Sequence, residues 1–364
     1  MELPWKKYND TVQMDVDEAQ MMRNYGQYIY RKYIFIVICI IGALLVAGMA
    51  TTIGPYDIGF FESYSIIIDH IFGNVEDVNK DFVIWNARMP RIVAGVIAGA
   101  GLAVAGATMQ STMKNPLADP YTTGISAGAS FGATVAITAG FSITGGNYAI
   151  VANAFIFSLI PMAVIMMVST VKHASPTTII LSGLAVMYIF NAMTTVLMLF
   201  ADSNALAEAF SWQVGTLGLV DWESIPIMFI FTLIGCIALQ ILAKKLNVLT
   251  SGDEGAKSLG IDADKLRLIS LLIVSLMAAA IVSFTGIIGF IGLVCPHICR
   301  MFIGSDNRFL IPASAAFGAV FLILADLIGR TIIAPTVLQV GVVTSFIGGP
   351  MLLYLLIKQK KEVW

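Results

Sequence analysis

Apolar stretches long enough to cross a bilayer recur from one end of this chain to the other. A helix needs about 20 predominantly apolar residues to span the hydrocarbon core, and many of the stretches reach that length. Inside the core a backbone satisfies its own hydrogen bonds only as a helix or as a closed barrel. The chain is 58% hydrophobic and only 12% charged, whereas soluble domains carry about 25% charged residues. The sequence therefore predicts an all-α, polytopic membrane protein.

Ten membrane-spanning helices are predicted, and together they form one transmembrane domain at residues 34–357. A polar tail at 1–33 precedes this domain, and a short tail at 358–364 follows it. The first tail is too long and too acidic to begin a signal peptide, so the first span is expected to stay in the membrane. The spans are expected at 34–53, 90–110, 118–140, 148–170, 178–201, 224–243, 267–285, 287–303, 309–330 and 337–357.

The distribution of lysine and arginine predicts the side of the membrane on which each loop lies. With the N-terminus inside, only Lys80, Arg88, Arg91 and Arg330 fall outside, and the other 17 of the 21 lysines and arginines fall inside. Cytoplasmic loops of membrane proteins carry such an excess of cations. Both termini are therefore expected in the cytoplasm, with the protein in the cell membrane.

The most charged connection between spans lies at 244–266, within the polar segment Thr250–Arg267. Seven residues of this segment are charged, and each charge would cost about 2.5–3.5 kcal/mol at the centre of a bilayer. The segment is therefore expected in water, with one short helix that ends at Gly260 and a second short helix that Asp262 caps. Two short helices at a membrane surface favour a docking surface for a separate protein. A solvated connection without a special role is the alternative.

The residues Gly252–Ser258 partly match a phosphate-binding loop, in which glycine directly precedes the lysine. Here Ala256 precedes Lys257, and the carboxylates of Asp253 and Glu254 would repel a phosphate. Nucleotide binding by this loop is therefore not expected.

No arrangement of residues suited to catalysis is visible, and an enzyme is not expected. One local cluster, Cys295-Pro296-His297-Ile298-Cys299, has a spacing that could gather metal ligands. Its cysteines are one turn apart with a proline between them, and no further histidine or cysteine is near in the sequence. The start of a helix is therefore favoured over a metal site, and no cofactor is expected on this chain.

Glycines repeat at helical spacing in two of the predicted spans. Small residues four apart allow the backbones of two membrane helices to approach closely. Tight packing is the favoured interpretation, and a direct role in conformational change is the alternative. The glycines are Gly95, Gly99 and Gly106 in the second span and Gly124, Gly128 and Gly132 in the third.

A series of short motifs runs through nearly all of residues 34–357. The motifs are Arg88-Met89-Pro90-Arg91, Gly106-Ala107-Thr108-Met109-Gln110, Asn115-Pro116-Leu117-Ala118-Asp119-Pro120, Gly124-Ile125-Ser126-Ala127-Gly128-Ala129, Gly252–Gly260, Gly286–Val294 with Pro296-His297, Ala325-Asp326-Leu327 with Arg330, and Gly341-Val342-Val343-Thr344. In this order they resemble the FecCD family of binding-protein-dependent importer permeases, whose members include the vitamin B12 permease.

The resemblance implies a vitamin B12 permease-like fold of ten helices per subunit, and a homodimer whose twofold axis contains the translocation pathway. It also implies two cytoplasmic ABC ATPase subunits that use ATP, and an external substrate-binding protein. The family transports iron–siderophore complexes, haem and cobalamin. Its members dock on the ATPase through the matching segment, where Gly255 replaces a usual apolar residue and predicts a weaker first helix. The implied coupling residues are Gly252, Asp253, Glu254, Ala256, Lys257, Ser258, Leu259 and Gly260.

The resemblance also suggests a cytoplasmic gate and a pathway helix. The turn with Asn115 and Leu117 matches a cytoplasmic constriction of the vitamin B12 permease, and a short loop between glycine-rich helices can close by small shear movements. An ordinary tight turn is the alternative. The fifth span corresponds to a pathway-lining helix by order alone, with Met187, Asn191, Thr194, Thr195 and Met198.

Three of the four outer cations are arginines near the ends of spans. Arginine is suited to bidentate capture of carboxylates, and the resemblance implies that Arg88, Arg91 and Arg330 contact acidic residues on the two lobes of the binding protein. Contact with lipid headgroups is the alternative. Asp326 lies four residues before Arg330 and can pair with it along one helix face.

The sequence thus favours the permease subunit of an ATP-driven importer for a large metal chelate, without indicating which chelate. An ion-gradient-driven secondary transporter or channel is the alternative from another class. Such a protein needs acidic residues deep in its spans, whereas Asp326 is the only carboxylate well inside a predicted span.

The predicted orientation can be tested by labelling cysteines from one side of the membrane. We expect Ser258→Cys to react with an impermeant thiol reagent only in inside-out vesicles, because 244–266 is placed in the cytoplasm. We expect Asn79→Cys to react only in right-side-out vesicles. Labelling of Ser258→Cys from the outside would overturn the assignment of every loop.

Overall fold

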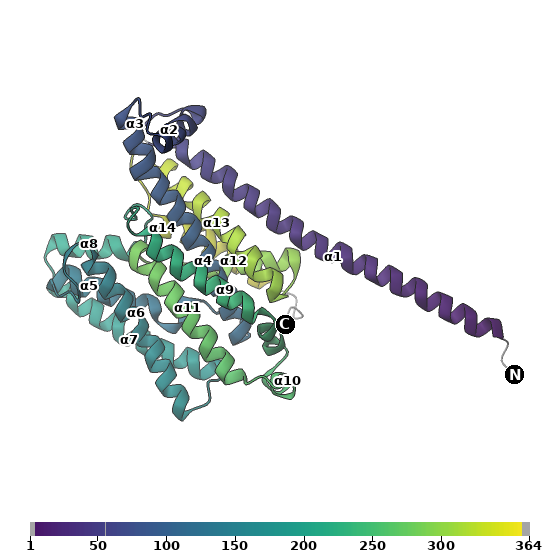
Figure 1. Ribbon diagram of the computed structural model, residues 1–364. Coiled ribbons are helices and arrows are strands. Elements are labelled where there is room, and N and C mark those ends of the chain that lie inside the picture. The colour runs from purple at the N-terminus through teal and green to yellow at the C-terminus, as the bar shows by residue number, and fades with distance from the viewer. Residues whose placement is uncertain (1–3, 55, 359–364) are drawn as a thin grey trace.

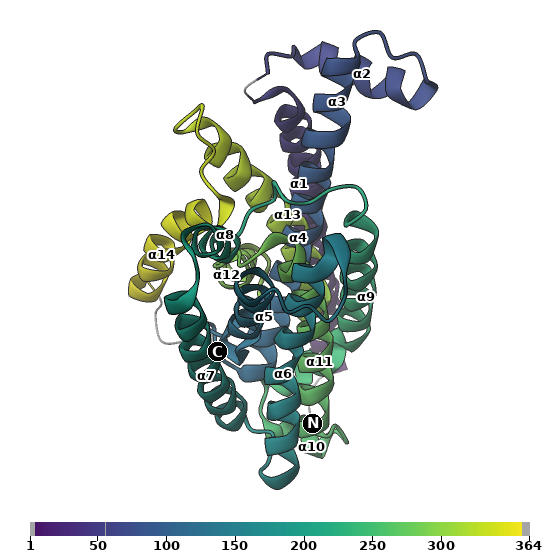
Figure 2. The ribbon, with the colours of Figure 1, turned by 90° about the vertical axis from the view of Figure 1, so that its left-hand side faces the viewer.

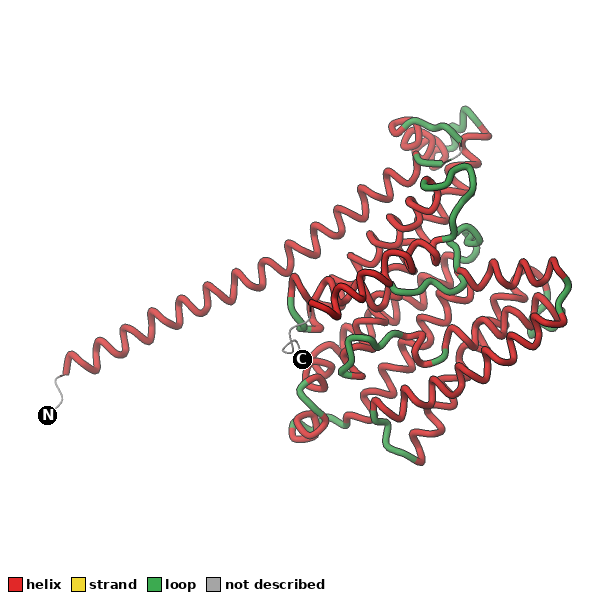
Figure 3. Tube along the Cα trace, turned by 180° about the vertical axis from the view of Figure 1, so that it is seen from behind, coloured by secondary structure: helices red, strands yellow, loops and turns green. Residues whose placement is uncertain are grey.

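The computed structural model describes residues 4–54 and 56–358, and the regular elements within these ranges are all helices (Figure 3). Helices satisfy the backbone hydrogen bonds within each segment, as a bilayer requires. Each of the ten predicted spans corresponds to a helix. These are α1 (Pro4–Thr52), α4 (Met89–Met113), α5 (Ile125–Ala139), α6 (Ala149–Val171), α7 (Pro176–Phe200), α9 (Ile225–Thr250), α11 (Ala263–Thr285), α12 (Ile291–Ile303), α13 (Asn307–Thr331) and α14 (Val340–Lys358).

Seven helices in the described part of the chain are long and apolar enough to cross a membrane, judged by length and composition. The helices α5 and α12 and the apolar part of α14 are shorter. The all-α, multi-pass architecture expected from the sequence is thereby confirmed.

Two helices begin later than the apolar runs predicted. The third run was expected to be helical from residue 118, but Asp119 accepts a hydrogen bond from the Tyr121 amide and caps a short 3-10 helix, η2 (Pro120–Thr123), which Gly124 ends at φ 89°. The eighth run was expected to be helical from residue 287, but α12 starts only after Phe290, whose φ of 68° is left-handed. Hydropathy averaged over a span does not register such backbone turns, because it depends on composition and not on backbone conformation.

The N-terminal tail continues the first span as one helix. Figure 1 shows α1 crossing the bundle obliquely and projecting well beyond it toward the N-terminus. Residues 1–3 of the predicted tail 1–33 lie outside the described residues, as do residues 359–364 of the predicted tail 358–364.

Several short helices in the connections were not predicted. The link between α1 and α4 forms α2 (Phe60–Phe72), α3 (Val78–Phe82) and the π-helix η1 (Val83–Arg88). The others are η3 (Gly146–Tyr148) and α8 (Ser203–Val214), whereas α10 (Asp253–Ser258) is the short helix that was expected before Gly260. Figures 1 and 2 show α2 and α3 at one end of the bundle and α10 at the other.

Helix α4 forms the centre of the bundle. In the most apolar part of the segment Val78–Met113, 83% of the residues are buried. The helix packs against α9, α11, α12 and α13. The remaining helices are therefore arranged around α4.

Glycines allow two neighbours to approach the α4 backbone. A Cβ atom on Gly99 would overlap the carbonyl oxygen of Gly318 in α13, and one on Gly106 would overlap that of Gly292 in α12. Of the predicted third-span ridge, Gly128 and Gly132 pack in the same way against the α6 backbone. Gly124 lies in the turn that ends η2, before α5 begins, and a Cβ atom there would still meet Pro161 of α6 at 3.3 Å and the Gly183 carbonyl oxygen of α7 at 3.0 Å.

The contact between α4 and α12 should not tolerate a methyl group. We expect Gly106→Ala to lower the free energy of unfolding by about 1–3 kcal/mol, the usual range for overpacking. The measurement is thermal unfolding in detergent. The matched control is Gly349→Ala in α14, where an added Cβ has no neighbour within 4 Å. Equal unfolding temperatures for the two variants would contradict this account of the core.

Candidate functional site

The predicted docking segment forms one short helix, α10, at the end of the bundle away from α2 and α3 (Figure 2). Gly252 precedes it at φ 119°, and Gly260 follows it at φ 74° and donates its amide to the Lys257 carbonyl. Gly260 therefore ends the helix as expected. The second short helix predicted here was wrong. Asp262 does accept a hydrogen bond from the Lys265 amide, but it caps α11, which continues unbroken to Thr285.

One side of α10 is fixed to the protein and the other faces outward. Ala256 is fully buried, and its carbonyl accepts the Ile261 amide. Leu259 is 69% exposed although it is apolar. Asp253, Glu254, Lys257, Ser258 and Gly260 are exposed as well, and Gly252 is half-buried. The segment thus presents a leucine within a polar surface.

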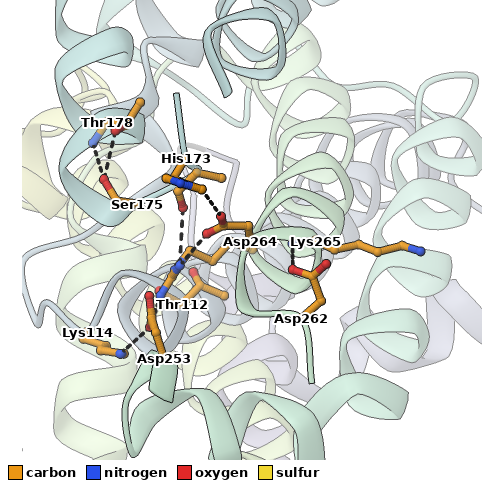
Figure 4. Close-up of polar contacts among 11 residues, drawn as sticks. Thr112, Lys114, His173, Ser175, Thr178, Asp253, Asp262, Asp264 and Lys265 are labelled. Carbon is orange, nitrogen blue, oxygen red and sulfur yellow. Dashed lines mark hydrogen bonds and ion pairs between the residues drawn. The ribbon is translucent and has the colours of Figure 1, made fainter. Parts of the chain in front are cut away.

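A buried arginine behind α10 holds four parts of the chain together. Arg267, in the first turns of α11, is 0% exposed. Its guanidinium donates to the Thr112 carbonyl of α4 at 3.2 Å and to the Ala174 carbonyl before α7 at 3.4 Å. It also pairs with Asp264 at 3.3 Å and with Asp253 of α10. Figure 4 shows the side chains of Asp253 and Asp264 gathered beside Thr112.

Asp253 connects α10 to the end of α4. Its carboxylate receives the Lys114 ammonium at 2.7 Å as well as the Arg267 guanidinium. Burial would raise the pKa of Asp253, but the hydrogen bonds from Arg267 and Lys114 outweigh burial and hold this pKa below its ordinary value. The carboxylate therefore stays charged at neutral pH and holds both cations.

The predicted gate turn directly follows Lys114. Lys114 ends α4 in a left-handed conformation at φ 50°. The Asn115 side-chain oxygen then accepts the Leu117 amide at 3.0 Å, and the Asn115 carbonyl accepts the Ala118 amide at 3.1 Å. The Leu117 side chain is exposed. A tight turn is therefore present, and its function as a gate stays a prediction.

The fold brings the docking segment and the gate turn together, which the sequence analysis did not foresee. Lys114 and Asp253 are 139 residues apart in the chain. The presence of Arg267 at the start of an apolar helix, three residues after Asp264, gave a local signal for one ion pair. No local signal indicated that Asp253 would join Lys114 and Arg267.

The five predicted pathway residues of α7 do not share one environment. Asn191 and Thr195 are exposed, and the Thr195 hydroxyl donates to the Asn191 carbonyl at 2.9 Å. Met187 and Met198 are half-buried, whereas Thr194 is buried. Asn191 and Thr195 show that α7 presents polar groups on its exposed face. The position of α7 in a pathway stays a prediction.

The three outer arginines point into the subunit. Arg88 is 5% exposed and donates to the carbonyls of Thr52 at 2.9 Å and Tyr56. Arg330 is 8% exposed and donates to the Ile53 carbonyl at 3.0 Å. Both therefore join the C-terminal end of α1 to the bundle.

Asp326 joins two of these arginines. It pairs with Arg330 one turn away at 3.1 Å, as the spacing predicted, and also with Arg91 of α4 at 2.7 Å. Contact between these arginines and a binding protein stays a prediction. In the single subunit they instead hold the C-terminal ends of α1 and α13 and the N-terminal end of α4 together.

Comparison with known proteins places the chain among transport proteins. The sequence profile of the FecCD transport family matches residues 36–358. The hemin transport system permease protein of Yersinia pestis is 38% identical, over 77% of this chain and 84% of the relative. The cobalamin import system permease protein of Halobacterium salinarum is also 38% identical, over 75% of this chain and 73% of the relative.

A solved structure has the same fold. It is an inward-facing conformation of a transporter assigned to the metal-chelate type of ABC transporters, with a TM-score of 0.79 and 26% identity. The match covers 89% of this chain and 99% of the solved chain. The helical arrangement described above is therefore that of a known class of membrane proteins.

The ion pairs of Asp253 should control the mobility of α10. We expect Asp253→Asn to speed amide hydrogen exchange at residues 252–261 by a factor on the order of 5. Hydrogen bonds to charged groups contribute about 1.5–3 kcal/mol, and solvent lowers this contribution at the half-exposed Asp253. The control is Glu254→Gln, which removes a neighbouring exposed carboxylate. Equal exchange in both variants would show that Asp253 does not fix α10.

Proposed function

This chain belongs to the FecCD transport family, and we propose that it is the membrane-spanning permease subunit of an ATP-driven importer for a metal chelate. Iron–siderophore complexes, haem and cobalamin are the proposed substrate classes. Relatives named as hemin and cobalamin permeases support this range, as does one named as an iron(3+)-hydroxamate import permease, which is 32% identical.

The observation that carries the proposal is the connection between α10 and the gate turn. Permeases of ABC importers work with a separate ATPase, so force must enter the permease through a contact surface. Leu259 offers an exposed apolar anchor on α10, and Asp253 links the base of that helix to Lys114 at the gate turn. A displacement of α10 would therefore be transmitted to the end of α4.

We further propose a homodimer with two cytoplasmic ATPase subunits and an outer substrate-binding protein. The exposed Asn191 and Thr195 on α7 support a pathway between two subunits, because polar groups on a span are unfavourable toward lipid. The cation asymmetry of the loops supports placing α10 and both termini in the cytoplasm.

An ion-gradient-driven transporter receives less support. Such a protein needs a carboxylate that can bind and release a coupling ion. Asp326 instead pairs with both Arg91 and Arg330 and is 3% exposed.

Co-purification and transport test the assignment directly. The chain should co-purify with an ATPase and a binding protein, and vesicles containing the complex should take up one of the three chelate classes only with ATP. Uptake driven by an ion gradient without ATP would favour the alternative.

Leu259 should be required for contact with the ATPase. We expect Leu259→Asp to insert and fold normally but to lose ATPase association and uptake, because a buried apolar anchor can contribute about 2 kcal/mol or more to an interface. The control is Leu259→Met, which keeps an apolar side chain. Normal uptake by Leu259→Asp would contradict the assignment of α10 as the docking surface for the ATPase.

The outer ends of α1, α4 and α13 are the proposed docking surface for the binding protein. We expect Arg88→Glu, Arg91→Glu and Arg330→Glu each to reduce stimulation of the ATPase by the binding protein while basal activity persists. If the arginines contact the partner directly, the defect should shrink as salt rises, because salt screens charges at an interface.

A purely internal role predicts a different result. The loss of stimulation would then be the same at every salt concentration, and the variants would unfold at lower temperature because buried contacts of the arginines are broken. Lys80→Glu, at an outer cation on α3, is the charge-matched control. Unchanged stimulation in all three arginine variants would remove this surface from the proposal.

A further inference from the structure

We propose that a groove between α1 and α9 binds an anionic phospholipid. Its acyl chain would fill the groove, and its phosphate would lie beside Lys244 and Lys245. The inference concerns a surface that the transport proposal does not use, and its test measures binding rather than transport.

The groove is an apolar cavity of about 670 Å³. Helices α1 and α9 form its two sides, and α4 and α13 form its floor. Two features leave this space open. Helix α1 packs mainly on α13 and makes few contacts with α4, and many of the side chains that line the groove are small. The alanines that line it are Ala43, Ala47, Ala100, Ala315, Ala316 and Ala319.

The groove opens toward the side of the bundle. Leu44 on α1 is 68% exposed and Ile241 on α9 is 74% exposed, and both line the groove. Each helix contains a candidate membrane span. The opening therefore faces the hydrocarbon of the bilayer, where lipid is the surrounding solvent.

The groove has a polar end on the side of α10. Gln240 lines the groove and donates its side-chain amide to the Arg308 carbonyl at 3.0 Å. One helical turn beyond Gln240 and Ile241, toward α10, α9 carries Lys244 and Lys245, both exposed. Residues four apart lie on the same helix face, so the two lysines continue the groove-lining face of α9.

The lysines are available to an anion. Lys32 and Arg308 also lie one turn beyond groove residues, but Lys32 is held between the rings of Tyr28 and Phe309, and Arg308 pairs with Asp306 at 2.6 Å. Among the described residues, no ion pair engages Lys244 or Lys245. Basic groups beside a cytoplasmic groove between membrane helices are suited to anionic lipid headgroups.

The size of the groove favours an acyl chain over a protein helix. A helix with its side chains is about 10 Å across. A length of only about 10 Å would then occupy roughly 800 Å³ and exceed the cavity.

Native mass spectrometry of the full-length chain tests the site. The protein is exchanged into detergent with phosphatidylglycerol or phosphatidylcholine, and retained lipid is counted. We expect the unsubstituted chain to retain phosphatidylglycerol preferentially. The double variant Lys244→Gln/Lys245→Gln should bind it on the order of 30-fold more weakly and lose the preference. Lys172→Gln, at an exposed lysine after α6, is the control.

A second variant fills the groove itself. Ala316→Phe should abolish retention of either lipid, whereas Ala163→Phe on the exposed face of α6 should not. If Ala316→Phe fails to fold, Ala315→Leu replaces it. Equal retention in the unsubstituted chain and the filled variants would overturn the groove, and equal preference in the lysine variant would overturn the phosphate site. Loss of self-association on filling, without bound lipid in the unsubstituted chain, would assign the groove to a second copy.

Discussion

The close approach of backbones around α4 is the contact on which the rest of the structure depends. In a bilayer, apolar side chains gain little by leaving lipid for protein, so helices associate through van der Waals packing and polar contacts. Gly99 lies against Gly318 and Gly106 against Gly292, which brings α13 and α12 directly onto α4. These contacts fix the position of α4, and the position of α4 in turn fixes the gate turn that follows it.

A cluster of charged groups lies at each end of the packed core. At one end Arg267 and Lys114 share Asp253, and at the other Arg91 and Arg330 share Asp326. A buried charge is costly without a partner, so each cluster holds its helices in one arrangement. The first cluster connects the exposed α10 to α4, and the second joins α1, α4 and α13. Force applied at α10 would thus reach a helix that is fixed at both ends.

The first helix is attached differently from the others. It leans chiefly on α13 and leaves an apolar groove beside α9. Arg88 and Arg330 hold its C-terminal end, and the aromatic contacts of Lys32 hold it further toward its N-terminus. The phospholipid proposed for the groove would fill the space between these two contacts.

The sequence by itself determined the ten apolar spans and their order, the polar connection that contains α10, and the family. These follow from local properties, since hydropathy over about 20 residues and short motifs are legible without knowing the fold. The tertiary structure decided which charges meet. Asp253 finds Lys114 across 139 residues and Asp326 finds Arg91 across 235 residues, and three arginines expected at an outer surface turn inward to carbonyls and a carboxylate. Such pairs depend on helix packing. A buried charge is costly unless it is paired, and packing decides which segments lie close enough to supply the partner.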